Sequence, residues 1–189
     1  MIINNVKLVL ENEVVSGSLE MQNGEIRAFA ESQSRLPEAM DGEGGWLLPG
    51  LIELHTDNLD KFFTPRPKVD WPAHSAMSSH DALMVASGIT TVLDAVAIGD
   101  VRDGGDRLEN LEKMINAIEE TQKRGVNRAE HRLHLRCELP HHTTLPLFEK
   151  LIDRESVSMV SLMDHSPGQR QYACLLYTSP SPRDTERSR

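Results

Sequence analysis

Two side chains that could share a metal ion follow an apolar segment near residue 50. The stretch LLPGLIELHTD, residues 47–57, is largely apolar up to Leu54 and then places His55 and Asp57 two residues apart. Side chains at this spacing on an extended chain project to the same side. Because a histidine nitrogen and an aspartate oxygen can bind one divalent cation, the pair is a candidate metal site. The alternative is a strand-end pair exposed to water.

Residues that bind metals recur at the ends of later predicted strands. Glu138 closes the apolar stretch LHLRCE, and His165 follows VSLMD. Another predicted strand ends near Asp94, which is followed by Ala-Val-Ala. In a barrel of parallel strands the chemistry gathers at the carboxyl ends of the strands. We therefore predict that His55, Asp57, Glu138 and His165 are metal ligands.

The loop after Glu138 contains two adjacent histidines, His141 and His142, in ELPHHTT. They could bind an anionic substrate or move protons, although exposed loop histidines are also common. Because adjacent side chains diverge, we expect at most one of them to face the site. Structural roles are expected for four other histidines: His74, His80, His131 and His134.

Basic residues also follow the predicted strands at this face. Lys61, Arg66 and Lys68 come after the first strand, and Arg170 comes after His165. Lysine and arginine side chains bind phosphate groups, so these four are candidate substrate-binding residues. The alternative is that they are solvated surface charges.

The elements that would position these residues fall into two predicted parts. Residues 1–46 contain short strand-like stretches and an Asn-Gly pair that favours a tight hairpin turn. From Trp46, apolar runs alternate with helical patterns, which predicts a parallel sheet covered by helices. The clearest helix spans residues 106–125, with apolar residues three and four apart at Leu108, Leu111, Met114, Ile115 and Ile118.

The predicted fold class is α/β, with four strand-and-helix repeats in residues 47–173. Four repeats are half of a (β/α)8 barrel, which usually takes about 250 residues, whereas this chain has 189. We therefore expect the N-terminal half of a barrel, truncated at its C-terminal end. Exposed strand edges and apolar faces would then favour aggregation or dimerisation, so we expect this chain alone to be poorly folded and inactive.

The last sixteen residues, 174–189, break the patterns that precede them. CLLYTSPSPRDTERSR shows neither helical period nor strand alternation. Its first part, residues 174–184, matches the translation of a transposase adapter used in sequencing libraries. We expect this tail to be foreign and disordered.

Composition narrows the class of protein. The net charge of −9 argues against binding to nucleic acid or membrane surfaces. The sequence has no long apolar run and no signal peptide, and its two cysteines show no metal-binding or disulfide pattern. We expect a cytoplasmic protein with a small-molecule substrate.

The segment DGEGGWLLPGLIELHTD, with a β-rich region before it and ASGITTVLDA after it, resembles the metal-dependent amidohydrolase superfamily. Here Asp57 replaces the usual second histidine and Glu53 the usual aspartate. The resemblance implies a divalent metal, Zn, Mn or Mg, and matches His55, Asp57, Glu138 and His165 to strand-end ligands. It also implies that residues 1–46 are part of a β-sandwich, and that the general base and further ligands lie beyond this chain.

Other stretches, including ELPHHTTLPLF and SLMDHSPGQRQ, resemble the branch of that superfamily that acts in the carbon-phosphorus lyase pathway of phosphonate utilisation. This implies cleavage of an anionic phosphonate ribosyl triphosphate to its 5-phosphate and pyrophosphate, by a full-length protein that could form homo-oligomers. Two alternatives stay open: hydrolysis of amide or cyclic amide bonds, and a non-catalytic half-barrel fragment.

Overall fold

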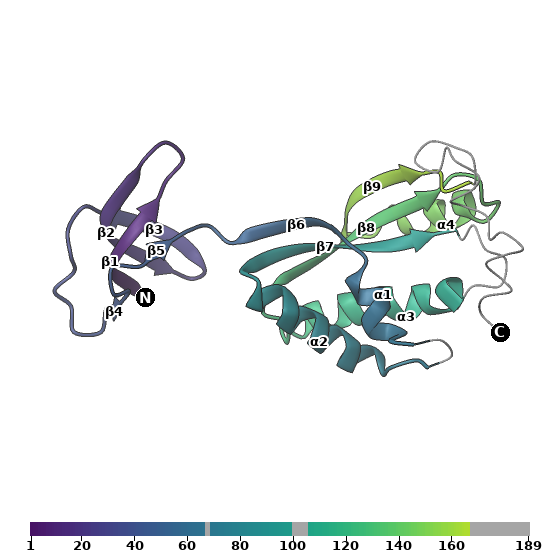
Figure 1. Ribbon diagram of the computed structural model, residues 1–189, viewed down its shortest axis with the longest axis horizontal. Helices are drawn as coiled ribbons and strands as arrows, with labels where there is room; N and C mark the ends of the chain where they lie inside the picture. Colours follow the sequence, from purple (N-terminus) through teal and green to yellow (C-terminus); the bar gives the residue numbers. More distant parts are fainter. Residues whose placement is uncertain (67–68, 100–105, 167–189) are drawn as a thin grey trace, which may run out of the picture. The chain divides into compact units, whose positions relative to one another are not determined.

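The computed structural model describes residues 1–66, 69–99 and 106–166. The chain divides into two compact units, Met1–Gly50 and Leu51–Arg189 (Figure 1). No helix in the described ranges is long and apolar enough to cross a membrane.

The first unit is a five-stranded sheet with the order β3-β2-β1-β4, in which β5 also pairs with β1. Its strands are β1 (Ile2–Val9), β2 (Val14–Gln22), β3 (Glu25–Ala30), β4 (Met40–Asp41) and β5 (Trp46–Leu47). The predicted tight turn joins β2 and β3, and both Asn23 and Gly24 have the positive φ, 54° and 79°, that such a turn requires. Val6, Leu8, Val15 and Leu19 form its buried core.

The second unit contains a four-stranded parallel sheet with the order β6-β7-β8-β9. The strands are β6 (Leu51–Thr56), β7 (Ile89–Ile98), β8 (Glu130–Glu138) and β9 (Val157–Met163). Neighbours in sequence are neighbours in the sheet, as in one half of a (β/α)8 barrel. The predicted α/β fold class is confirmed.

The apolar run that begins at Trp46 is divided between two strands in the structure. Trp46 and Leu47 pair with β1 in the first unit, whereas β6 begins at Leu51 in the second. Pro49 and Gly50 lie between the two strands. Proline lacks the N–H that continues a ladder and glycine weakens a strand, which accounts for the break.

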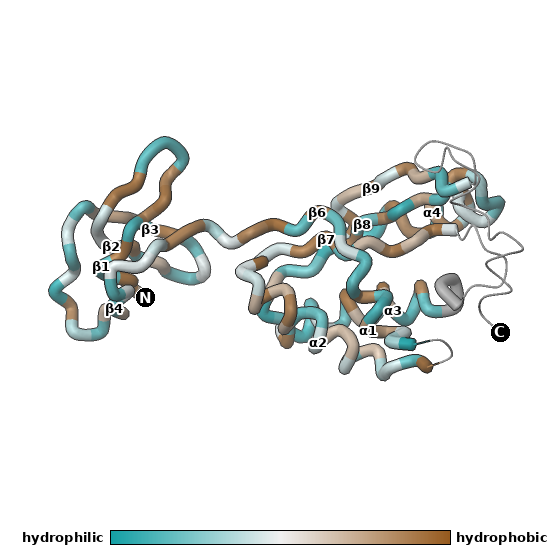
Figure 2. Tube along the Cα trace, viewed as in Figure 1, coloured by the Kyte–Doolittle hydropathy of each residue, from teal (hydrophilic) through white to brown (hydrophobic). Residues whose placement is uncertain are grey.

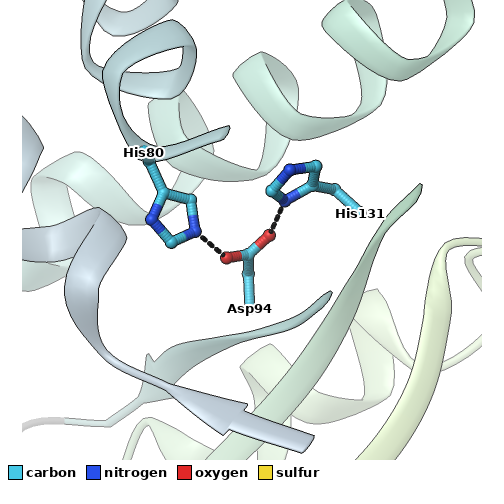
Figure 3. Close-up of side chains that lie close together, drawn as sticks. All are labelled: His80, Asp94 and His131. Carbon is cyan, nitrogen blue, oxygen red and sulfur yellow. Dashed lines mark hydrogen bonds and ion pairs between the residues drawn. The ribbon is translucent and has the colours of Figure 1, made fainter. Parts of the chain in front are cut away.

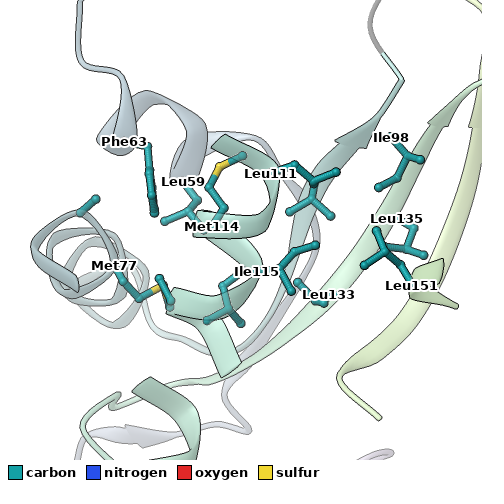
Figure 4. Close-up of a cluster of buried hydrophobic side chains, with 14 of the residues drawn as sticks. Leu59, Phe63, Met77, Ile98, Leu111, Met114, Ile115, Leu133, Leu135 and Leu151 are labelled. Carbon is teal, nitrogen blue, oxygen red and sulfur yellow. The ribbon is translucent and has the colours of Figure 1, made fainter. Parts of the chain in front are cut away.

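In the described ranges, four helices accompany the parallel sheet: α1 (Asn58–Phe63), α2 (Ala73–Ala86), α3 (Asp106–Lys123) and α4 (Thr144–Leu151). Figure 1 shows α1, α2 and α3 together along one face of the sheet. The apolar stripe of α3 is buried at Leu111, Met114, Ile115 and Ile118, where it packs in one cluster with Leu133 and Leu135 of β8 (Figure 4). The side chain of Leu108 lies outside the described residues.

The two outer strands of this sheet carry exposed apolar side chains. On β6, Leu51, Ile52 and Leu54 are 59%, 63% and 53% exposed, and on β9 Leu162 is 65% exposed. Figure 2 shows the apolar character of the chain entering β6 (brown). Among the described strands, β6 and β9 each pair on one side only.

Candidate metal and substrate site

The four predicted metal ligands lie at one edge of the parallel sheet. His55 is near the end of β6, and Asp57 is the N-cap residue of α1, directly after that strand. Glu138 is the last residue of β8, and His165 follows the end of β9 at Met163. Because all four strands are parallel, these carboxyl ends meet at the same edge.

A chain of contacts links the four residues through an arginine that the sequence did not single out. His55 Nε2 lies 3.6 Å from Asp57 Oδ2, and Arg136 Nη1 donates to Asp57 Oδ1 at 2.7 Å. Arg136 Nε lies 3.9 Å from Glu138 Oε1, which in turn pairs with His165 Nδ1 at 2.6 Å. We call these five residues the strand-end network.

Burial within the strand-end network is uneven. The side chains of Glu138 and Arg136 are 3% and 11% exposed, whereas those of His55 and Asp57 are 37% and 42% exposed. Within the described residues, Glu138 Oε2 is buried and has no hydrogen-bond partner. Burying a carboxylate oxygen that has no hydrogen-bond partner costs folding free energy. This atom is therefore suited to bind a cation, or to accept a hydrogen bond from a donor outside the protein.

His134 lies close to the predicted ligand His55, although only a structural role was expected for it from the sequence. Its ring packs edge-on against the His55 ring, with centroids 4.8 Å apart. Nδ1 donates to the Leu54 carbonyl at 3.0 Å, and the Ser161 hydroxyl donates to Nε2 at 2.8 Å. Burial lowers the pKa of His134, which favours this neutral form. The alternation of polar and apolar residues in LHLRCE is the signal that could have identified His134 and Arg136 together.

His141 and His142 do not diverge as the sequence predicted. Their rings stack with centroids 4.6 Å apart and an interplanar angle of 30°, and His141 Nδ1 contacts Thr143 Oγ1 at 2.7 Å. His142 is exposed and His141 is partly buried. Their role in substrate binding stays a prediction.

Two of the predicted basic residues are described, and both are exposed. Lys61 Nζ donates to Asn58 Oδ1 at 3.4 Å within α1. The backbone of Arg66 forms an isolated antiparallel β-bridge with Val69. Lys68 and Arg170 lie outside the described residues. Substrate binding by these four residues stays a prediction.

A second, fully buried cluster lies between α2 and the parallel sheet (Figure 3). Asp94 of β7 contacts His80 Nε2 at 2.6 Å and His131 Nδ1 at 2.7 Å, and His131 Nε2 lies 3.3 Å from Asp81 Oδ1. Within the described ranges, His80, Asp94 and His131 offer ligand atoms within 4.8 Å of one another and could hold a metal ion. The 2.6 and 2.7 Å separations are themselves those of charge-assisted hydrogen bonds.

Electrostatics in this buried cluster favour charged groups. Burial alone would raise the pKa of Asp94, but hydrogen bonds from His131 and His80 and their charges outweigh it and lower that pKa. Burial likewise opposes the charged form of His131, yet its contacts with Asp94 and Asp81 raise its pKa. The pKa of Asp81 is lowered, because hydrogen bonds from the Ala129 and Arg128 backbone overcome its burial.

The chain is 96% identical over 173 residues, 92% of its length, to alpha-D-ribose 1-methylphosphonate 5-triphosphate diphosphatase of Escherichia coli (strain K12). The resemblance predicted from the sequence is confirmed. The chain spans about half the length of this curated relative, 46%. No family model matches the sequence.

The fold is similar to that of a solved D-hydantoinase, with a TM-score of 0.50 and 21% sequence identity over 84% of this chain and 32% of the other. This likeness concerns the fold alone, and it agrees with the predicted part of an amidohydrolase barrel.

Proposed function

We propose that this chain supplies the first barrel half of a metal-dependent hydrolase that cleaves alpha-D-ribose 1-methylphosphonate 5-triphosphate to the 5-phosphate and pyrophosphate. The observation that carries the proposal is the 96% identity over 173 residues to the E. coli diphosphatase. Because the chain spans 46% of that relative, the activity is proposed for the complete protein.

The strand-end network suits a divalent metal. The 3.6 Å between His55 Nε2 and Asp57 Oδ2 is close to the separation of two ligand atoms that share one ion at about 2.0–2.2 Å. Among the described residues, Glu138 offers a buried oxygen that has no hydrogen-bond partner, and His165 contacts the other oxygen of the same carboxylate. We propose that His55, Asp57, Glu138 and His165 hold the ion, although in the described part of the chain it is His80, Asp94 and His131, and not these residues, that offer three ligand atoms within 4.8 Å of one another. Nitrogen and carboxylate oxygen donors suit Zn, Mn or Mg.

A bound divalent ion would supply a water of lowered pKa and neutralise phosphoryl oxygens. The residues of this chain would fix the ion and orient the substrate. Lys61 and Arg66, and Lys68 and Arg170 outside the described residues, would neutralise the triphosphate. His141 and His142 would line the same opening. The general base is expected beyond this chain, so none of its residues is assigned that role.

The test is reconstitution. The 189-residue chain is co-expressed with the part of the E. coli relative that it lacks, and the purified pair is incubated with the ribosyl triphosphate and Mn²⁺ or Zn²⁺. Phosphorus NMR should show pyrophosphate and the 5-phosphate, and neither product with the chain alone. Asp57→Asn in the reconstituted pair should abolish the reaction.

Three outcomes would contradict the proposal. Release of inorganic phosphate in place of pyrophosphate would indicate a different phosphohydrolase. Hydrolysis of a cyclic amide, with the triphosphate left intact, would favour the alternative amidohydrolase reaction. A reconstituted pair that turns over neither substrate would favour the non-catalytic fragment.

A further inference from the structure

We infer that Arg136 is the residue that positions Asp57 for metal binding, and this inference rests on the proposed function. The guanidinium donates to Asp57 Oδ1 at 2.7 Å, while the other carboxylate oxygen, Oδ2, faces His55 Nε2 at 3.6 Å. One oxygen of Asp57 is thus held by the arginine, and the second is directed toward the predicted histidine ligand.

The location of Arg136 suits this role. It lies in β8, whose central pairings with β7 and β9 make it a rigid part of the sheet, and its side chain is 11% exposed. Asp57 lies 79 residues earlier, between β6 and α1, and its side chain is 42% exposed. Because Arg136 is held in a buried strand, its contact restricts the rotamers of the more exposed Asp57 side chain.

Arg136 also faces the second pair of predicted ligands. Its Nε lies 3.9 Å from Glu138 Oε1, the oxygen that contacts His165. Within the described residues this Nε is buried and has no hydrogen-bond partner, so the guanidinium is held chiefly by its contacts with the two carboxylates. One side chain therefore spans the ligands of β6 and those of β8 and β9.

Replacing a residue that hydrogen-bonds to a metal ligand and fixes its orientation typically lowers metal affinity about 10- to 100-fold. Arg136→Gln should therefore weaken metal binding at least about tenfold. Arg136→Lys keeps a positive charge and a donor but not the planar fork, so it should weaken binding only a few-fold. The matched control is Arg132→Gln on the same face of β8, because Arg132 contacts Glu130 and Ser158.

The experiment titrates Mn²⁺ into the reconstituted pair, in which the 189-residue chain is joined by the part of the relative that it lacks, and follows the free ion by electron paramagnetic resonance. Circular dichroism and thermal midpoints without metal are recorded for every variant, because a merely structural role would lower the midpoint and leave Mn²⁺ affinity unchanged. The unsubstituted protein and Arg132→Gln should bind Mn²⁺ most tightly, Arg136→Lys less tightly and Arg136→Gln less tightly still. Asp57→Asn is the reference for loss of the ligand itself.

The outcomes separate the inference from the proposed function. If the parent binds Mn²⁺ through Asp57 but Arg136→Gln binds as tightly as Arg132→Gln, the role of Arg136 alone is overturned. If the parent binds no Mn²⁺, or binds it equally well after Asp57→Asn, the proposed metal site fails and the inference fails with it. Where Arg136→Gln does not fold, Arg136→Lys decides, and an affinity equal to that of the parent overturns the inference.

Discussion

The buried carboxylate of Asp94 should matter far more to stability than a surface carboxylate with an equally short ion pair. Asp94 Oδ1 lies 2.6 Å from His80 Nε2, and both side chains are 0% exposed. Its other oxygen lies 2.7 Å from His131 Nδ1. Asp94→Asn preserves the shape, removes the charge and replaces one acceptor by a donor, so one of the two histidines loses its partner.

Breaking a buried ion pair by removal of one member costs about 3–5 kcal/mol, because the remaining charge stays buried and uncompensated. That is a large part of the roughly 5–15 kcal/mol by which a native domain is stable. The control is Glu112→Gln, because Glu112 also pairs at 2.6 Å, with Lys150, but the two side chains are 67% and 60% exposed. Solvent screens such a pair, so its loss should leave stability nearly unchanged.

The assay is urea unfolding of the reconstituted pair, followed by far-UV circular dichroism at neutral pH. We expect Asp94→Asn to lower the unfolding free energy by about 3–5 kcal/mol, and Glu112→Gln to unfold at the urea midpoint of the parent. Equal midpoints for the parent and Asp94→Asn would refute the reasoning.

Two further predictions concern pH and the apolar core. Asp81 and Asp94, with lowered pKa values, contribute stability above the ordinary value of 3.8 that is lost as pH falls through their folded pKa values. His131, with a raised pKa, contributes stability below 6.5 that is lost as pH rises through its folded pKa. The urea midpoint of unfolding should therefore be highest between the pH at which Asp81 and Asp94 become protonated and the pH at which His131 loses its proton. A pH profile without this maximum would contradict the stabilising role of the buried cluster. Ile118→Ala, at a fully buried position in α3, should cost about 2–5 kcal/mol of unfolding free energy, whereas Leu145→Ala, 64% exposed, should cost little. Equal losses for the two variants, measured by urea unfolding, would contradict the packing of α3.

Much of the fold follows from local patterns in the sequence. The spacing of Leu111, Met114, Ile115 and Ile118 predicts α3 and its buried face, and both are found. The short helix α1 was not predicted, because its six residues are too few for an apolar period to show. The break between β5 and β6 was also missed, although Pro49 and Gly50 are the local signal for it.

The candidate site could be predicted only in part. The rule that chemistry gathers at carboxyl strand ends selects His55, Asp57, Glu138 and His165, and the structure places contacts between them, but their role as metal ligands stays a prediction. Their link through Arg136 depends on a contact between residues 79 positions apart, which no local pattern encodes. The buried cluster around Asp94 was missed for the same reason, since its partners come from α2 and β8.

The central claim is that the strand-end network, and not the buried cluster, holds the metal of the proposed hydrolase. Anomalous X-ray diffraction at the zinc edge, on crystals of the reconstituted protein grown with Zn²⁺, would place the ion directly. We predict a peak about 2.0–2.2 Å from ligand atoms of His55 and Asp57. A peak among His80, Asp94 and His131, with none at the strand ends, would contradict the account.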